Sequence, residues 1–352
     1  MEIRRYGVTS GGDEVAQYTL RGDGIVVRFL SYGGIITDIE VPDRAGVAAN
    51  VVLGLPTLGD YEAKNGRYYF GGIVGRYAGR IAGARFALDG EEVRLHANEG
   101  SNAVHGGRGE SFIAKLWEVE PLEDLDGGGA LLRYTSSDGE QGFPGRMHLE
   151  VAYRLGLGCQ LRIDYAARTD RSTVLNLTNH SYFNLAAGGV GSVLDHSLQL
   201  FADRLIATDD AGIPDGKFPP VAGSAFDFRQ PRRIGERLDE AQPRILGQCG
   251  YNHSWLIDSV AGRLSPAARL MDPGSGRALE VLTTEPSVHV YTANHFAGED
   301  VGAGGAPLVR HAAVALETQH LPDSPNRPEF PSTLLRPGET FHSTTIYRFE
   351  TA

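Results

Sequence analysis

HLEVAYRLGLGCQLRIDYAA, residues 148–167, indicates the fold class more clearly than any other stretch of the chain. Apolar and polar side chains alternate through residues 148–155, and the alternation resumes through residues 159–167 after a Gly-Leu-Gly tripeptide. Such a period of two is the pattern of a β-strand with one face against a core. The stretch therefore predicts two antiparallel strands joined as a hairpin.

The same pattern recurs along the chain. A second hairpin is predicted around Asp89-Gly90, because this dipeptide supplies the positive φ angles of a tight turn between apolar positions on either side. Further strands are predicted at residues 24–30, 35–41, 131–135, 198–201, 278–283, 288–292 and 344–349. Helical patterns are confined to residues 57–63 and 234–241.

Turn residues are abundant, with 46 glycines and 18 prolines among 352 residues. No internal repeat, low-complexity tract or charged linker divides the chain. We therefore expect an all-β protein, a large antiparallel β-sandwich, with residues 1–352 forming a single domain.

Composition restricts the classes of partner. The formal net charge is −11, without a basic cluster, which argues against nucleic acid as a partner. No apolar run approaches the roughly 18 residues needed to span a membrane, and the first residues, MEIRRYGVTSGGDE, lack the apolar segment of a secretory signal. The expected location is the cytoplasm. Cys159 and Cys249 form no CxxC pattern, so free thiols are expected in place of a disulfide or a structural zinc site.

Three separate stretches place an acid-base side chain among hydrogen-bonding residues. They are NEGSNAVHGG with His105, TNHSYFNL with His180, and LETQHLPDSPN with Glu317. A sugar hemiacetal opens when one group takes the proton of the anomeric hydroxyl while another protonates the ring oxygen, and this chemistry needs no metal or nucleotide.

Each candidate also has a structural explanation. His105 could bind loop carbonyl groups, although Asn98 and Asn102 beside it suit recognition of vicinal hydroxyls. His180 could belong to a polar network in the core. Glu317 follows the apolar run Ala-Val-Ala-Leu, so burial is expected to raise its pKa. The alternative is an ion pair with Arg310 or Arg327.

Other chemistries find less support. No HExxH pair and no histidines two residues apart on a strand provide a metal site, so no metal or other cofactor is expected. The chain lacks G-x-S-x-G, the pattern of a serine nucleophile. The glycines at residues 71–75 are followed by Arg76 and by no Lys-Ser/Thr, which argues against a phosphate loop.

At the three acid-base stretches the chain resembles the aldose 1-epimerase, or galactose mutarotase, family. The resemblance extends through FGGIVGRYAGRI, GYNHSW, TTEPSVHVYTANHF and PGETFHSTTIYRF, at residues 70–81, 250–255, 283–296 and 337–349. It implies the two-sheet supersandwich of that family. It also implies Glu317 as the base, His180 as the acid, His105 as a polarising group and Arg80 as a ligand for sugar hydroxyls.

The chain departs from the family pattern at three positions expected to contact the sugar. Gly79 replaces the usual Asn before the arginine, Asn252 stands in place of Asp, and His289 stands in place of Gln. The expected partner is a small free aldose, with a preference for one other than galactose, and the expected enzyme is a monomer or homodimer.

Two other functions stay open at this level. One is a non-catalytic carbohydrate-binding sandwich. The other is a related enzyme acting on phosphorylated or uronic sugars, which would need a basic cluster drawn from Arg67, Arg76 and Arg80.

Overall fold

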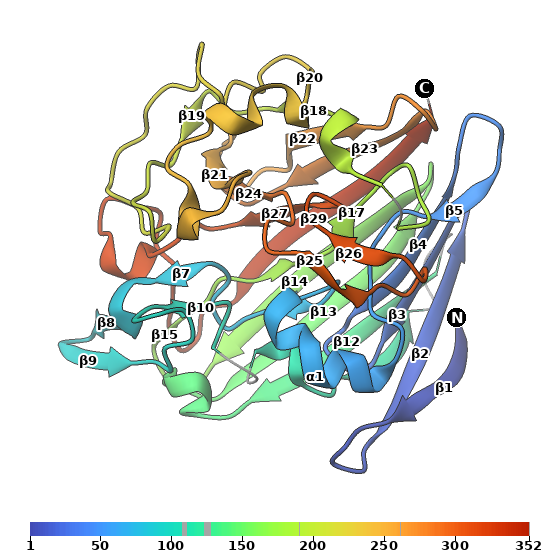
Figure 1. The fold of residues 1–352 in the computed structure, drawn as a ribbon. Coiled ribbons are helices and arrows are strands. Elements are labelled where there is room, and N and C mark those ends of the chain that lie inside the picture. Colours follow the sequence, from blue (N-terminus) through green and yellow to red (C-terminus); the bar gives the residue numbers. More distant parts are fainter. Residues whose placement is uncertain (108–110, 123–127, 190, 261, 352) are drawn as a thin grey trace.

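A computed structural model describes residues 1–107, 111–122, 128–189, 191–260 and 262–351. Its largest element is an antiparallel sheet of nine strands (Figure 1). In spatial order these strands are β11 (Glu118–Leu122), β12 (Gly129–Ser136), β13 (Met147–Gly156), β14 (Gln160–Thr169), β29 (Phe341–Thr351), β23 (Arg277–Thr283), β22 (Ser265–Met271), β18 (Ser197–Leu200) and β20 (Arg232–Arg233). The predicted hairpin at residues 148–167 is β13 and β14, at the centre of one half of this sheet.

Two five-stranded sheets accompany it. The N-terminal sheet, drawn in blue in Figure 1, contains β1 (Glu2–Val8), β2 (Glu14–Gly22), β3 (Ile25–Leu30), β4 (Ile36–Pro42) and β5 (Ala48–Asn50). The other, called here the site sheet, contains β17 (Tyr182–Phe183), β27 (Val314–Gln319), β24 (Ser287–Tyr291), β21 (Asn252–Leu256) and β19 (Arg204–Leu205).

Five two-stranded ribbons complete the described strands. They pair β6 (Ile73–Val74) with β16 (Thr178–Asn179), β7 (Arg80–Ile81) with β10 (Ala103–Val104), β8 (Arg85–Leu88) with β9 (Glu91–Arg94), β15 (Thr173–Val174) with β28 (Leu334–Leu335), and β25 (Ala297–Val301) with β26 (Pro307–Val309). The β8–β9 hairpin confirms the predicted turn, since Asp89 and Gly90 both have positive φ.

Helices are short, as predicted. The α-helix α1 (Leu58–Tyr68) begins where the Thr57 hydroxyl accepts a hydrogen bond from the Asp60 amide. It runs five residues beyond the predicted end, where Asn65 bonds both backbone groups of Phe70 and Tyr68 packs against Phe70 and Phe296. The second predicted helix is the 3₁₀ segment η5 (Ile234–Glu240), interrupted at Arg237 by non-helical backbone angles. The other 3₁₀ segments are η1 (Ala82–Ala84), η2 (Phe112–Ala114), η3 (Glu140–Gly142), η4 (Val193–Asp195), η6 (Ile245–Gly247) and η7 (Ser324–Asn326).

One large apolar core lies between the nine-stranded sheet and the other two. Phe29 of β3 meets Tyr153 of β13 edge to face, with ring centroids 5.1 Å apart. Phe183 of β17 meets Tyr347 of β29 in the same way at 5.1 Å. The same face of the nine-stranded sheet thus packs against both smaller sheets, and the all-β sandwich predicted from the sequence is confirmed. No helix in the described ranges is both long and apolar enough to cross a membrane.

Candidate active site

The site sheet carries polar side chains on the face turned away from the core. Along β27, the side chains of Leu316 and Thr318 point to one face, and those of Glu317 and Gln319 point to the other. Glu317 is the direct cross-strand partner of His289 on β24, which in turn pairs with Ser254 on β21. The strand period and the pairing together bring residues far apart in sequence into one row.

His180 lies beside this row. It occupies the link between β16 and β17, where its amide donates to the Gly72 carbonyl and its carbonyl accepts from the Gly71 amide. Its Nε2 atom lies 3.4 Å from Oε1 of Glu317, and the exposed fractions of the two side chains are only 4% and 1%. The acid and base candidates are therefore close enough to share a proton.

Burial determines the charge of this pair. It raises the pKa of Glu317 to about 8, although Arg80 opposes the shift, and it lowers the pKa of His180 to about 3. The alternative ion pair of Glu317 with Arg310 or Arg327 is not formed; Arg327 lies 3.5 Å from Asp323. Among the described residues, the one group within ion-pair distance of the buried Glu317 carboxyl is thus His180.

His105 is fixed by two reciprocal hydrogen bonds with Gly79. The His105 amide donates to the Gly79 carbonyl at 3.1 Å, and the Gly79 amide donates to Nδ1 of His105 at 3.3 Å. Because Nδ1 accepts, the proton of the neutral ring must be on Nε2. Burial lowers the pKa of His105, so the neutral form prevails. His105 therefore presents a hydrogen-bond donor to the cavity.

Arg80 begins β7 and has a partner that the sequence did not predict. Its Nε and Nη2 atoms donate to the two carboxylate oxygens of Glu99, at 2.5 and 2.9 Å. This bidentate pair fixes the plane of the guanidinium and leaves its Nη1 edge free of this contact. Arg76 lies elsewhere, fully buried and bonded to Ser136 and two carbonyl groups. Arg67 and Arg80 line the cavity and Arg76 does not, so the three arginines do not form the one basic cluster expected for phosphorylated or uronic sugars.

Asn102 is placed differently from our expectation. Its side-chain oxygen accepts a hydrogen bond from the Gly83 amide at 3.0 Å, and it is not among the residues lining the cavity. Asn98 likewise bonds both backbone groups of Val104. These amides hold the loop that carries His105, and the structure does not bring Asn102 together with the other predicted site residues.

Asn252, His289 and Ser254 form a hydrogen-bonded chain across β21 and β24. His289 Nε2 lies 2.8 Å from Oδ1 of Asn252, and Nδ1 lies 2.8 Å from the Ser254 hydroxyl. Since Oδ1 can only accept, Nε2 carries the proton and Nδ1 accepts from the hydroxyl. Asn252 consequently has its amide N–H groups available for a ligand.

These residues enclose a cavity of about 310 Å³, a size suited to a small polar molecule. Its other walls are Arg67, Tyr69, Glu99, Val104, Tyr182, Leu246, Gln248, Tyr291, His295, Gln319 and Pro322. Sequence reasoning did not single out Tyr69, Glu99, Val104, Leu246 or Gln248. Tyr69 and Tyr182 flank the His180 ring, with centroids at 5.9 and 4.9 Å. The sequence offered one signal for each tyrosine. Tyr182 follows His180 by two residues in TNHSYF, and Tyr69 directly precedes the FGGIVGRYAGRI stretch.

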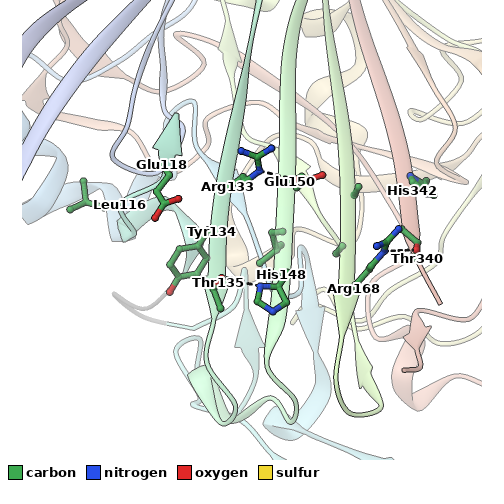
Figure 2. Close-up of a pocket in the computed structure, with 13 residues that line it drawn as sticks. Leu116, Glu118, Arg133, Tyr134, Thr135, His148, Glu150, Arg168, Thr340 and His342 are labelled. Atoms are coloured by element: carbon green, nitrogen blue, oxygen red, sulfur yellow. Dashed lines mark hydrogen bonds and ion pairs between the residues drawn. The ribbon is translucent and has the colours of Figure 1, made fainter. Parts of the chain in front are cut away.

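A larger hollow of about 720 Å³ lies on the solvent face of the nine-stranded sheet (Figure 2). Arg133 there pairs with Glu150 at 2.9 Å, and Arg168 donates to Thr340 at 2.9 Å. His148 contacts the Thr135 hydroxyl and has no carboxylate within ion-pair distance in the described ranges. The ion-paired side chains of this hollow are exposed, and none of its described residues forms a buried acid-base pair. The smaller cavity is therefore the candidate active site.

His105, His180 and Glu317 each offer a ligand atom within 4.8 Å of the others. Within the described ranges this is the one group of three His, Cys, Asp or Glu residues that could hold a metal ion. These are the same three side chains that the sequence predicted as acid-base groups.

A model of the aldose 1-epimerase family matches residues 16–348. The galactose mutarotase of Mus musculus is 40% identical over 343 residues, which cover 97% of this chain and 96% of that protein. The aldose 1-epimerase of Escherichia coli strain K12 is 35% identical and covers 94% of both chains. The chain belongs to the aldose 1-epimerase family.

Solved structures agree with this assignment. The galactose 1-epimerase of Lactobacillus acidophilus superimposes with a TM-score of 0.86 at 29% identity, covering 100% of this chain and 98% of that one. An aldose epimerase homologue from C. elegans gives a TM-score of 0.85 at 26% identity, covering 96% and 99%. The family, its fold and the isomerase class predicted from the sequence are thereby confirmed.

Proposed function

We propose that this aldose 1-epimerase interconverts the α and β anomers of a free aldose by proton transfers to and from Glu317 and His180. The observation that carries the assignment is the 3.4 Å contact between Nε2 of His180 and Oε1 of Glu317 inside a cavity of sugar size. A non-catalytic binding protein has no need of a carboxylic acid kept out of water in this way.

Ring opening uses both groups at once. The Glu317 carboxylate takes the proton of the anomeric hydroxyl as His180 delivers its Nε2 proton to the ring oxygen. The bond between C1 and the ring oxygen breaks, and C1 becomes the carbonyl carbon of the open aldehyde. Glu317 is then protonated and His180 is neutral.

The shifted pKa values fix the proton count before the reaction. Between about pH 3 and pH 8 the pair holds one proton, which lies on Glu317 in the empty site. A bound sugar donates its anomeric hydroxyl to the carboxylate and accepts from Nε2 through the ring oxygen. Both contacts favour the tautomer with the proton on His180, so binding prepares the pair for catalysis.

Closure reverses the roles. After rotation about the C1–C2 bond the opposite face of the aldehyde meets the hydroxyl that forms the ring. His180 accepts that hydroxyl proton and Glu317 returns its proton to the carbonyl oxygen, giving the other anomer. Proton transfer of this kind contributes on the order of 10² to 10⁴ in rate per group.

Neighbouring residues position the sugar. His105, fixed as a donor through Nε2, polarises an oxygen near the reacting centre. Arg80, held by Glu99, directs its remaining N–H groups to sugar hydroxyls. Tyr69 and Tyr182 provide flat apolar surface beside the acid.

The preferred aldose is proposed to differ from galactose. Asn252 offers N–H donors where a carboxylate would offer charged acceptors, because its oxygen is engaged by His289. A lost charge-assisted hydrogen bond is worth about 1.5 to 3 kcal/mol. Gly79 removes a side chain and opens space, so a pentose or 6-deoxy sugar is the expected substrate.

The domain organisation, cellular location and oligomeric state are also proposals. Residues 1–352 act as one catalytic domain, supported by the shared core of the sheets. Cys159 and Cys249 are free thiols, as is usual in the cytoplasm. The cavity is assembled within one chain, which supports a monomer or a homodimer without shared sites.

The test is polarimetry on freshly dissolved single anomers of galactose, glucose, xylose, arabinose and fucose. Acceleration of at least one sugar to its equilibrium rotation is expected. A protein that binds these sugars without accelerating any of them would be a binding module, and the proposal would be wrong.

A further inference from the structure

Gln319 is a cavity residue whose side chain has no partner. It follows Glu317 by two positions on β27 and so faces the cavity, and it is 1% exposed. Its Oε1 atom is buried without a hydrogen-bond partner in the described ranges, and its Nε2 atom faces Gly79. Its backbone pairs with Ser287 of β24, and its carbonyl also accepts from the Ser287 hydroxyl at 2.7 Å.

An unpartnered buried amide is costly and uncommon in folded proteins. The local packing explains why no neighbour satisfies it. Gly79 lies opposite, and a Cβ at residue 79 would be 3.3 Å from Nε2 of Gln319 and 3.7 Å from Pro322. The amide therefore faces space that a side chain at residue 79 would fill.

We propose that Gln319, Gly79 and Pro322 form a hydroxyl-binding subsite that selects the sugar. The Nε2 amide of Gln319, which faces Gly79, donates a hydrogen bond to a hydroxyl seated there. Residues two apart on a strand are separated by about 6.8 Å, farther than adjacent hydroxyls of one ring. Gln319 thus binds the hydroxyl of a sugar carbon beyond C2, while Glu317 acts on the hydroxyl at C1. This inference rests on the proposed function only in that the ligand is a sugar.

The first experiment pairs a protein change with a ligand change. Gln319→Met keeps the length of the side chain and removes its hydrogen bonds. KM for the preferred aldose is expected to rise about 3- to 10-fold, as for one lost hydrogen bond, with kcat little changed. Either the 3-deoxy or the 4-deoxy analogue of that aldose should show the same loss with the unchanged protein and no further loss with the variant.

The second experiment fills the space. Asparagine tolerates the φ of +81° at residue 79, and its side chain would reach the Gln319 amide. Gly79→Asn should raise KM for the same aldose, and Gln319→Met should add little in that background. The matched control is Gln199→Met. Gln199 lies on β18, its amide donates to the Arg229 carbonyl, and its replacement should leave kcat and KM unchanged.

Thermal unfolding separates binding from folding. Gln319→Met should be at least as stable as the unchanged protein, because it removes an unsatisfied buried amide. A folded Gln319→Met protein with unchanged KM for every sugar, or equal losses with the 3-deoxy and the 4-deoxy analogue, would overturn the subsite. Absence of mutarotation in the unchanged protein would instead overturn the proposed function.

Discussion

Nε2 of His180 lies 3.4 Å from Oε1 of Glu317, although one residue belongs to a link between strands and the other to a regular strand. Glu317 stands within a regular strand of the site sheet, and His180 stands on the two-residue link between β16 and β17. Neither side chain has an exposed surface large enough for bulk water to solvate it. The pair is therefore a single proton-sharing unit, and the first predictions treat it so.

Removing either group should abolish most of the activity. Glu317→Gln and His180→Asn are each expected to lower kcat by at least about 10², while sugar binding is largely kept, because shape and polarity survive. The double variant should be barely slower than either single one. Polarimetric kcat with sugar affinity measured by calorimetry checks this, and near-normal turnover in either variant would contradict the roles assigned.

The pH dependence follows from the proton count. Catalysis needs one proton on the pair, and burial raises the pKa of Glu317 to about 8. Above that pH the proton is lost, so kcat/KM should fall about tenfold per pH unit, with a flat region at lower pH. The residual activity of Glu317→Gln should lack this alkaline limb. An identical limb in the variant would point to another group.

Glu317 should also make stability depend on pH. A folded pKa near 8, above the ordinary 4.5, gives stability that is fully present below about pH 4.5 and lost as pH rises through 8. The free energy of unfolding of Glu317→Gln should therefore increase relative to that of the unchanged protein between pH 5 and pH 9. The expected gain is at least about 1.4 kcal/mol, the equivalent of one pKa unit. Urea unfolding at both pH values measures it, and a constant difference would argue against the buried acid.

Asn252 should govern discrimination against galactose. The unchanged enzyme is expected to turn over galactose less efficiently than a pentose or fucose. Asn252→Asp restores a charged acceptor beside His289 and should raise kcat/KM for galactose about tenfold or more. The five-sugar panel decides it; a clear preference of the unchanged enzyme for galactose would show that the substitutions at Gly79, Asn252 and His289 are neutral.

Chelation should leave mutarotation unaffected. The proposed proton transfer needs no metal, although His105, His180 and Glu317 are close enough to hold an ion. Activity is measured before and after exhaustive treatment with a chelator. Loss of activity that one particular ion restores would assign those three residues to a metal instead.

The sequence predicted strands and acid-base residues better than their partners. Alternation located the hairpin of β13 and β14, and Asp89-Gly90 located a turn, because both signals depend on local backbone preferences. Strands β1 and β2 were missed. The first has mostly exposed side chains, so it shows little apolar contrast.

Partners in the site depend on tertiary packing. The pairing of Arg80 with Glu99 and the turning of Asn102 toward Gly83 join groups 19 residues apart in sequence, and no local pattern specifies such contacts. Gln319 was passed over because its lack of a partner is visible only once the surroundings of Gly79 are known.

The pairing of β27 with β24 has a consequence for quality control during folding. If β27 slipped by one residue, Leu316 would enter the cavity and Glu317 would be forced into the apolar core, since strand side chains alternate between faces. Such a misfolded chain would lose its base and at the same time bury an unpaired carboxyl group among aliphatic side chains. The register of β27 that stabilises the sandwich is therefore also the register that places Glu317 in the cavity. Chains with β27 in the wrong register would be unstable as well as inactive.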